Sequence, residues 1–96
     1  MMETGTSQET TRWQPNGEIT IFEAEAAHRE LTTLLQQEGL LELHLDRLSR
    51  IDTAGVQLVV SACASGRASI HSASSGVIDA LRSLGCEDVL PSSLRT

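Results

Sequence analysis

The sequence contains no lysine and no tyrosine, and apart from histidine its only aromatic residues are Trp13 and Phe22. Proteins that bind single-stranded nucleic acid combine a basic groove with stacking aromatic side chains. Seven arginines against thirteen acidic residues leave a net charge of −6, so there is no basic stripe to neutralise phosphates. We therefore expect no nucleic-acid partner. A phosphate-binding loop of the GxxxxGK[ST] type is also excluded, because it requires a lysine.

Cysteine is scarce, and long apolar runs are missing. Cys63 and Cys86 lack the paired spacing of a zinc site, so we interpret them as small hydrophobic residues and predict no metal and no other cofactor. No apolar run approaches the roughly 20 residues that span a membrane. The polar start of the chain does not resemble a signal peptide. We expect a cytoplasmic protein without direct membrane insertion.

Ninety-six residues suffice for one domain. The polar residues 1–10 predict a disordered lead, and residues 11–96 a single domain. Local patterns predict a β-hairpin of Thr11–Gln14 and Glu18–Ile21, a helix from a Thr20–Glu23 capping box to Gly39, and a strand over Leu40–Asp46. After a linker over Arg47–Ile51 they predict a helix from Asp52 or Thr53 to Gly66, a strand over Ala68–Ser72, a helix from Ser74 or Ser75 to Gly85, and an irregular C-terminal segment pinned by Val89 and Leu90.

The predicted strands alternate apolar and polar residues, which decides how the layers are arranged. Parallel strands that are buried on both faces read as continuous apolar runs, and these do not. We therefore predict an α/β fold with a four-stranded mixed sheet and three helices packed on one face. The other face would carry the polar side chains Glu18, Thr20, Glu42, His44, Ser69 and His71. We interpret His44, His71 and Glu42 as part of a solvated sheet face, and a weak metal site formed by these three residues is the alternative.

The stretch LHLDRLSRIDTAGVQLV, from Leu43 to Val59, resembles the core signature of STAS domains, the family of anti-sigma factor antagonists. In that signature an L-x-L-D strand and a loop precede D-[ST]-[SAG]-G at a helix start. Upstream, EITIFEA over residues 18–24 is similar to the T-I-Y-E-A segment of stand-alone STAS proteins from bacterial chemotaxis clusters. The resemblance covers roughly residues 11–90 and implies the STAS fold.

The resemblance implies a non-enzymatic protein-interaction switch in bacterial signalling that docks through the helix start. Asp52 can cap the first turn, Thr53 presents a hydroxyl at the positive end of the helix dipole, and Gly55 lets a partner backbone approach. The implied partner is a kinase-like anti-sigma factor, a chemosensory protein or a transporter ATPase. The candidate partner-binding residues are Asp52, Thr53, Ala54, Gly55, Gln57 and Ser49.

Thr53 is the candidate phosphoacceptor, although the motif departs from the family pattern beside it. Ala54 stands where the best-known antagonists carry their phosphorylated serine, and Thr53 is the only hydroxyl left in D-T-A-G. Phosphoregulation and constitutive docking both stay open. The ending CEDVLP over residues 86–91 also resembles the accessory STAS subunit of a lipid-transport ABC ATPase complex, which is the alternative function. No serine lies in a hydrolase signature, so no enzyme is predicted.

Overall fold

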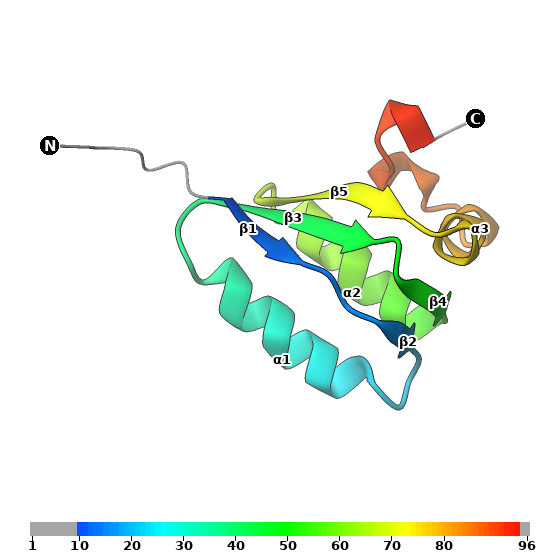
Figure 1. Cartoon of the computed structure of the whole chain (residues 1–96), viewed down its shortest axis with the longest axis horizontal. Helices are drawn as coiled ribbons and strands as arrows, with labels where there is room; N and C mark the ends of the chain where they lie inside the picture. Colours follow the sequence, from blue (N-terminus) through cyan, green and yellow to red (C-terminus); the bar gives the residue numbers. More distant parts are fainter. Residues whose placement is uncertain (1–9, 95–96) are drawn as a thin grey trace, which may run out of the picture.

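A computed structural model of the chain describes residues 10–94, in which five strands and three α-helices follow one another (Figure 1). The strands are β1 (Thr10–Trp13), β2 (Gly17–Ile19), β3 (Leu40–Leu45), β4 (Leu48–Ile51) and β5 (Ala68–Ala73). The helices are α1 (Ala24–Leu35), α2 (Thr53–Ala64) and α3 (Ser75–Ser83), followed by the short 3-10 helices η1 (Glu87–Val89) and η2 (Ser92–Leu94). Within residues 10–94 no helix combines the length and the apolar character that crossing a bilayer requires.

The strands form two small sheets in which every pairing is parallel: β1-β3-β5, with β3 in the centre, and β2-β4. β1 runs on into β2 and β3 runs on into β4, so two bent segments lie side by side (Figure 1). Five strands in two sheets therefore replace the single four-stranded mixed sheet that the sequence predicts. The linker predicted over Arg47–Ile51 is also corrected, because it contains strand β4.

The predicted hairpin of Thr11–Gln14 and Glu18–Ile21 is wrong. β1 and β2 pair with β3 and β4 and not with each other, and Pro15-Asn16-Gly17 carries the chain forward between them. Parallel pairing leaves Trp13 only 6% and Ile19 only 3% exposed. A hairpin on its own is marginally stable, because it has no second layer to cover it. Burial of apolar surface thus outweighs the local preference of Asn-Gly for a reversing turn.

The alternation predicted for β3 is confirmed. Leu41, Leu43 and Leu45 are buried, whereas Glu42 and His44 are half-buried on the opposite face. α1 and α2 lie together behind the β1-β3-β5 sheet in Figure 1, as predicted. α3 lies instead at the end of this sheet beside β4, so the prediction of three helices on one face is corrected. The core between these layers is aliphatic apart from Trp13, and its most completely buried side chains are Leu43, Leu45, Leu48, Leu81, Leu90, Val56, Val59 and Val77.

Side-chain hydrogen bonds lie near the helix starts. The Thr20 amide and hydroxyl donate to Glu23 Oε1 at 2.8 and 2.6 Å, so the predicted pair is in contact. The predicted helix start at Thr20 is corrected, because α1 begins only at Ala24 and its N-cap residue Glu23 makes no side-chain cap. These hydrogen bonds from Thr20 hold the pKa of Glu23 below its ordinary value. At α3 the Ser74 hydroxyl accepts from the Val77 amide at 3.3 Å, so Ser74 is the cap. The predicted lead over residues 1–10 lies outside the described residues except for Thr10, which begins β1.

Candidate functional site

The start of α2 is organised by Asp52, the N-cap residue. One carboxylate oxygen, Oδ1, accepts from the amides of Ala54 and Gly55 at 3.0 and 3.2 Å. The other oxygen, Oδ2, accepts from the Ile21 amide at 3.0 Å. Asp52 therefore satisfies two otherwise unpaired helix amides and also ties the turn before α1 to the start of α2. The sequence predicts the first role and does not reveal the second.

These bonds predict how the stability responds to changes at Asp52. Asp52→Ala should lower the free energy of unfolding by about 1–2 kcal/mol, because it removes the cap and the bond to Ile21 together. Asp52→Asn should cost less, since asparagine caps about as well and loses only the second acceptor. Urea denaturation of both variants against the wild-type chain measures the difference. Equal stability of all three would show that Asp52 does not cap α2.

Thr53 is the first residue of α2, and its side chain is exposed. Among residues 10–94 no hydrogen bond holds its hydroxyl, which leaves the oxygen accessible to a partner or a modifying enzyme. Ala54 beside it is half-buried, and Gln57 is exposed one turn further along the helix. The structure thus brings Asp52, Thr53, Ala54 and Gln57 together on one end of the molecule.

Gly55 is buried, and this changes the reason for a glycine at the position. A Cβ atom built there would lie 2.5 Å from the Ile19 carbonyl oxygen and 2.5 Å from Ile51 Cγ1. Such contacts are far inside van der Waals distance. The backbone that approaches Gly55 closely is therefore this chain's own strand β2 and not a partner's.

Ser49 lies within β4, where its hydroxyl donates to the Gly17 carbonyl of strand β2 at 3.0 Å. Its side chain is exposed, but none of its hydrogen bonds joins it to Asp52–Gly55. The structure therefore uses this serine to link two strands, and it contributes less directly to the helix start than the sequence suggests.

An exposed apolar pair, Ile21 and Phe22, lies in the turn between β2 and α1 and was missed at the sequence level. Their exposed fractions are 70% and 89%, although the hairpin prediction placed Ile21 on the same face as the buried Ile19. The bond from the Ile21 amide to Asp52 places this turn against the start of α2. The predicted capping box would instead place Ile21 and Phe22 in the first turn of the helix, so it does not indicate their exposure.

On its other side Thr53 borders a groove of about 400 Å³ between α2 and the end of α3. Leu84, which is 44% exposed, contributes an apolar wall. The full lining consists of Thr53, Val56, Gln57, Val60, Ser61, Leu84 and Cys86. We define the docking surface as Ile21, Phe22, Asp52, Thr53, Ala54 and Gln57 together with this groove.

Comparison with known proteins shows a fold similar to that of two solved structures. No family model and no curated protein matches the chain. The anti-sigma factor antagonist SpoIIAA in its unphosphorylated form has a similar structure, with a TM-score of 0.67 and 22% identity over 93% of this chain and 83% of that chain. A sulfate transporter family protein from Wolinella succinogenes gives a TM-score of 0.65 and 17% identity over 88% of this chain and 73% of that chain.

Proposed function

We propose that this chain, which has the STAS-type fold, is a non-enzymatic protein-interaction domain of bacterial signalling that binds a protein partner through the docking surface. The observation that supports this most strongly is the exposed Thr53 hydroxyl beside the exposed pair Ile21 and Phe22. The fold is shared with an anti-sigma factor antagonist, a protein whose name states a regulatory role. The proposed partner is a kinase-like anti-sigma factor or a chemosensory protein.

This end of the molecule carries exposed apolar side chains that a bound partner would bury. Phe22 is 89% exposed and Ile21 is 70% exposed, and both belong to the turn that Asp52 fixes in place. Aromatic anchors at the centre of an interface commonly carry a large share of the binding energy. Thr53 would lie inside such an interface, because it adjoins the anchored turn through Asp52.

Phosphorylation of Thr53 would oppose docking through charge. A phosphate adds about −1.5 to −2 charges, and here it would stand next to the Asp52 carboxylate. The helix amides nearest to it are already occupied, because Asp52 Oδ1 accepts from Ala54 and Gly55. The added charge would then repel an acidic or apolar partner surface while the core, which Thr53 does not enter, stays intact. Thr53 is the proposed phosphoacceptor of the switch.

The test replaces Thr53 with glutamate. Thr53→Glu should weaken partner binding at least tenfold, about 1.4 kcal/mol, and should leave the melting temperature nearly unchanged because the side chain is exposed. Thr53→Ala should bind like the wild type and melt nearly like it. The measurement is a calorimetric titration against the products of neighbouring genes, with a melting curve for each variant.

Thr33→Glu is the matched control, because it makes the same change at an exposed position in the last turn of α1, far from the start of α2 (Figure 1). It should bind as the wild type does. Unchanged affinity of Thr53→Glu would contradict docking at the start of α2. A collapsed melting curve for the same variant would mean that Thr53 supports the core, which also contradicts the proposal.

The second candidate function is an accessory subunit of a lipid-transport ABC ATPase complex. The similar structure of a sulfate transporter family protein favours it, because a fold of this kind also occurs in a protein named for transport. Both functions use the same docking surface. The neighbouring gene product that binds distinguishes them: a chemosensory or anti-sigma kinase supports signalling, and a transporter ATPase supports the alternative.

A further inference from the structure

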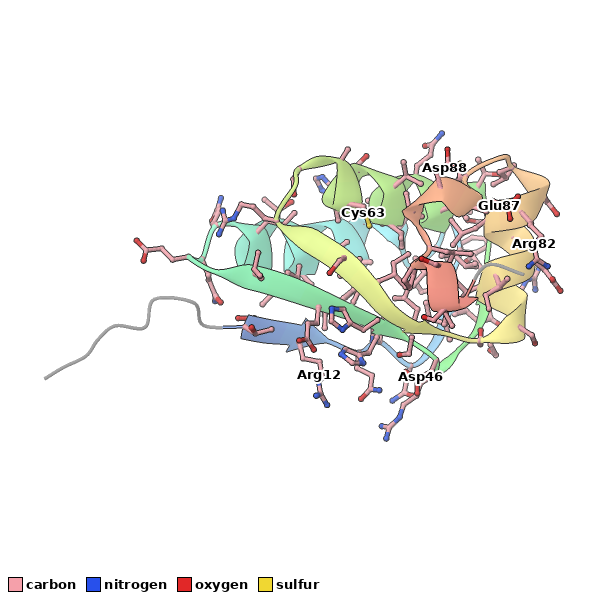
Figure 2. The ribbon with its side chains drawn as sticks, turned by 90° about the horizontal axis from the view of Figure 1, so that it is seen from above. Arg12, Asp46, Cys63, Arg82, Glu87 and Asp88 are labelled. Atoms are coloured by element: carbon pink, nitrogen blue, oxygen red, sulfur yellow. The ribbon has the colours of Figure 1, made fainter. Side chains whose placement is uncertain are left out.

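The open face of the β1-β3-β5 sheet gathers three side chains with metal-binding atoms. Glu42 and His44 are two residues apart on β3 and project from the same face, and His71 comes from the neighbouring strand β5. One ligand atom from each of the three lies within 4.8 Å of the others. Figure 2 shows the labelled Arg12 and Asp46 side chains on this face, opposite the side where α2 carries Cys63.

An irregularity in β5 creates this cluster. The register pairs Leu43 with Ile70 and then His44 with Ser72, so His71 is an extra residue in the β5 strand. In a regular strand the side chains of His71 and Ser72 would point to opposite faces. Here both reach His44: the two imidazole rings stack with centroids 5.6 Å apart, and Ser72 Oγ lies 3.3 Å from His44 Nδ1. Bulges of this kind redirect side chains and are frequent beside functional sites.

Both ring nitrogens of His44 have polar neighbours on this face. Nδ1 lies 3.3 Å from Ser72 Oγ, whose hydroxyl donates to Asp46 Oδ1 at 2.9 Å. Nε2 lies 2.9 Å from Glu42 Oε1. The ring is therefore held from both sides, with its outer nitrogen directed at the Glu42 carboxylate.

Two carboxylates of this network have pKa values below their ordinary values. The hydrogen bond from His44 is the main reason that the pKa of Glu42 lies below its ordinary value, and the nearby His71 acts in the same direction. Hydrogen bonds from Gln14 and Ser72 likewise lower the pKa of Asp46. In metal sites a ligating histidine usually donates its other ring N–H to a carboxylate, a carbonyl or water, which fixes the ring and raises its basicity. The His44-Ser72-Asp46 chain supplies an equivalent support through a hydroxyl.

We propose that Glu42 Oε1, His44 Nε2 and one ring nitrogen of His71 bind a divalent transition-metal ion of the Zn²⁺ class. Imidazole and carboxylate are suitable ligands for zinc, and three protein ligands leave a position open for water or for a group from a partner. Metal–ligand bonds of about 2.0–2.2 Å need ligand atoms roughly 3.3 Å apart in a tetrahedron. Glu42 Oε1 and His44 Nε2, at 2.9 Å, lie slightly closer together than this, and small side-chain rotations of these two residues and of the exposed His71 would bring the three ligand atoms to the required spacing.

Arg12 carries a positive charge on this face that opposes a cation. It pairs in register with Glu42 across β1 and β3, and its positive charge contributes to the lowered pKa of that carboxylate. Its side chain is exposed and projects away from the sheet (Figure 2). Replacing it with glutamine should therefore tighten metal binding without removing a ligand.

The experiment titrates tag-free full-length chain with Zn²⁺ alone, using calorimetry and a chromophoric chelator as competitor. The wild type should show a single saturable site whose affinity falls with falling pH, because its ligands must lose their protons. His71→Ala and Glu42→Gln should each weaken binding at least tenfold, and Arg12→Gln should strengthen it. Circular dichroism should show the wild-type fold in all of these variants, since the replaced side chains lie on the open face.

Two controls make the assignment specific. His28→Ala removes the third histidine of the chain, an exposed residue of α1, and should leave the affinity unchanged. The double variant Cys63→Ser with Cys86→Ser should also bind as the wild type does. Absence of saturable binding, equal weakening by His28→Ala and His71→Ala, or loss in the cysteine variant would each overturn the site. The docking surface does not include these ligands, so the result is independent of the proposed function.

Discussion

Replacing Leu43 with alanine should lower the free energy of unfolding by about 2–4 kcal/mol, the largest effect expected in this protein. Leu43 is fully buried on the central strand β3, where it pairs with Trp13 on one side and Ile70 on the other. Removing three carbon atoms there loses their transfer free energy and leaves a cavity that the flanking strands cannot fill. Val59→Ala, at an equally buried position of α2, should also destabilise strongly.

Glu42→Ala is the matched control for Leu43→Ala, because it truncates the adjacent residue on the opposite face of the same strand. Glu42 is half-buried and makes its hydrogen bond to His44 outside the core, so in metal-free buffer its loss should cost little. Urea denaturation followed by circular dichroism measures all three variants. If Glu42→Ala were the costliest of the three, the facing of β3 would be misassigned.

The second large effect is expected for Gly55→Ala, and its sign is informative. At an exposed helix position this substitution stabilises by up to about 1 kcal/mol, because alanine is the better helix former. At Gly55 the added Cβ would meet the Ile19 carbonyl oxygen and Ile51 Cγ1 at 2.5 Å. Overpacking of this kind usually costs about 1–3 kcal/mol, so Gly55→Ala should destabilise the chain.

Gln57→Ala provides the comparison within the same helix, since Gln57 is exposed and the change also introduces alanine. It should alter the free energy of unfolding by no more than about 0.5 kcal/mol. A stabilising Gly55→Ala would show that α2 does not pack against β2 as described. The expected destabilisation would show that glycine serves the internal packing that holds Asp52 and Thr53 in place.

Several features of this protein follow from short stretches of sequence. Asp52 before an apolar helical pattern predicts both the start of α2 and the exposure of Thr53, because N-capping depends on neighbouring backbone amides. The Thr20–Glu23 contact is also local and predicted, although α1 begins at Ala24 and not directly after Thr20. The alternation of Leu41, Leu43 and Leu45 assigns the buried face of β3, since successive side chains in a strand point to opposite faces. Each of these depends on interactions within a few residues.

The strand partners were decided by the tertiary structure. Pro15-Asn16-Gly17 favours a reversing turn locally, yet the chain continues forward because parallel pairing buries Trp13 and Ile19 under the helices. The exposure of Ile21 likewise follows from its bond to Asp52, which lies 31 residues away. Neither outcome can be read from local preferences, because the competing free energy comes from segments distant in the sequence.

The clustering of Glu42, His44 and His71 depends on the same kind of long-range information. Sequence alternation places all three on the open sheet face, as predicted, but it does not fix how β5 aligns with β3. One extra residue in β5 sets that alignment and brings both His71 and Ser72 to His44. The sequence by itself thus determined the caps and starts of α2 and α3 and the buried face of β3, which are local. Strand order and register were decided by the tertiary structure, because they depend on how much apolar surface the whole folded chain buries.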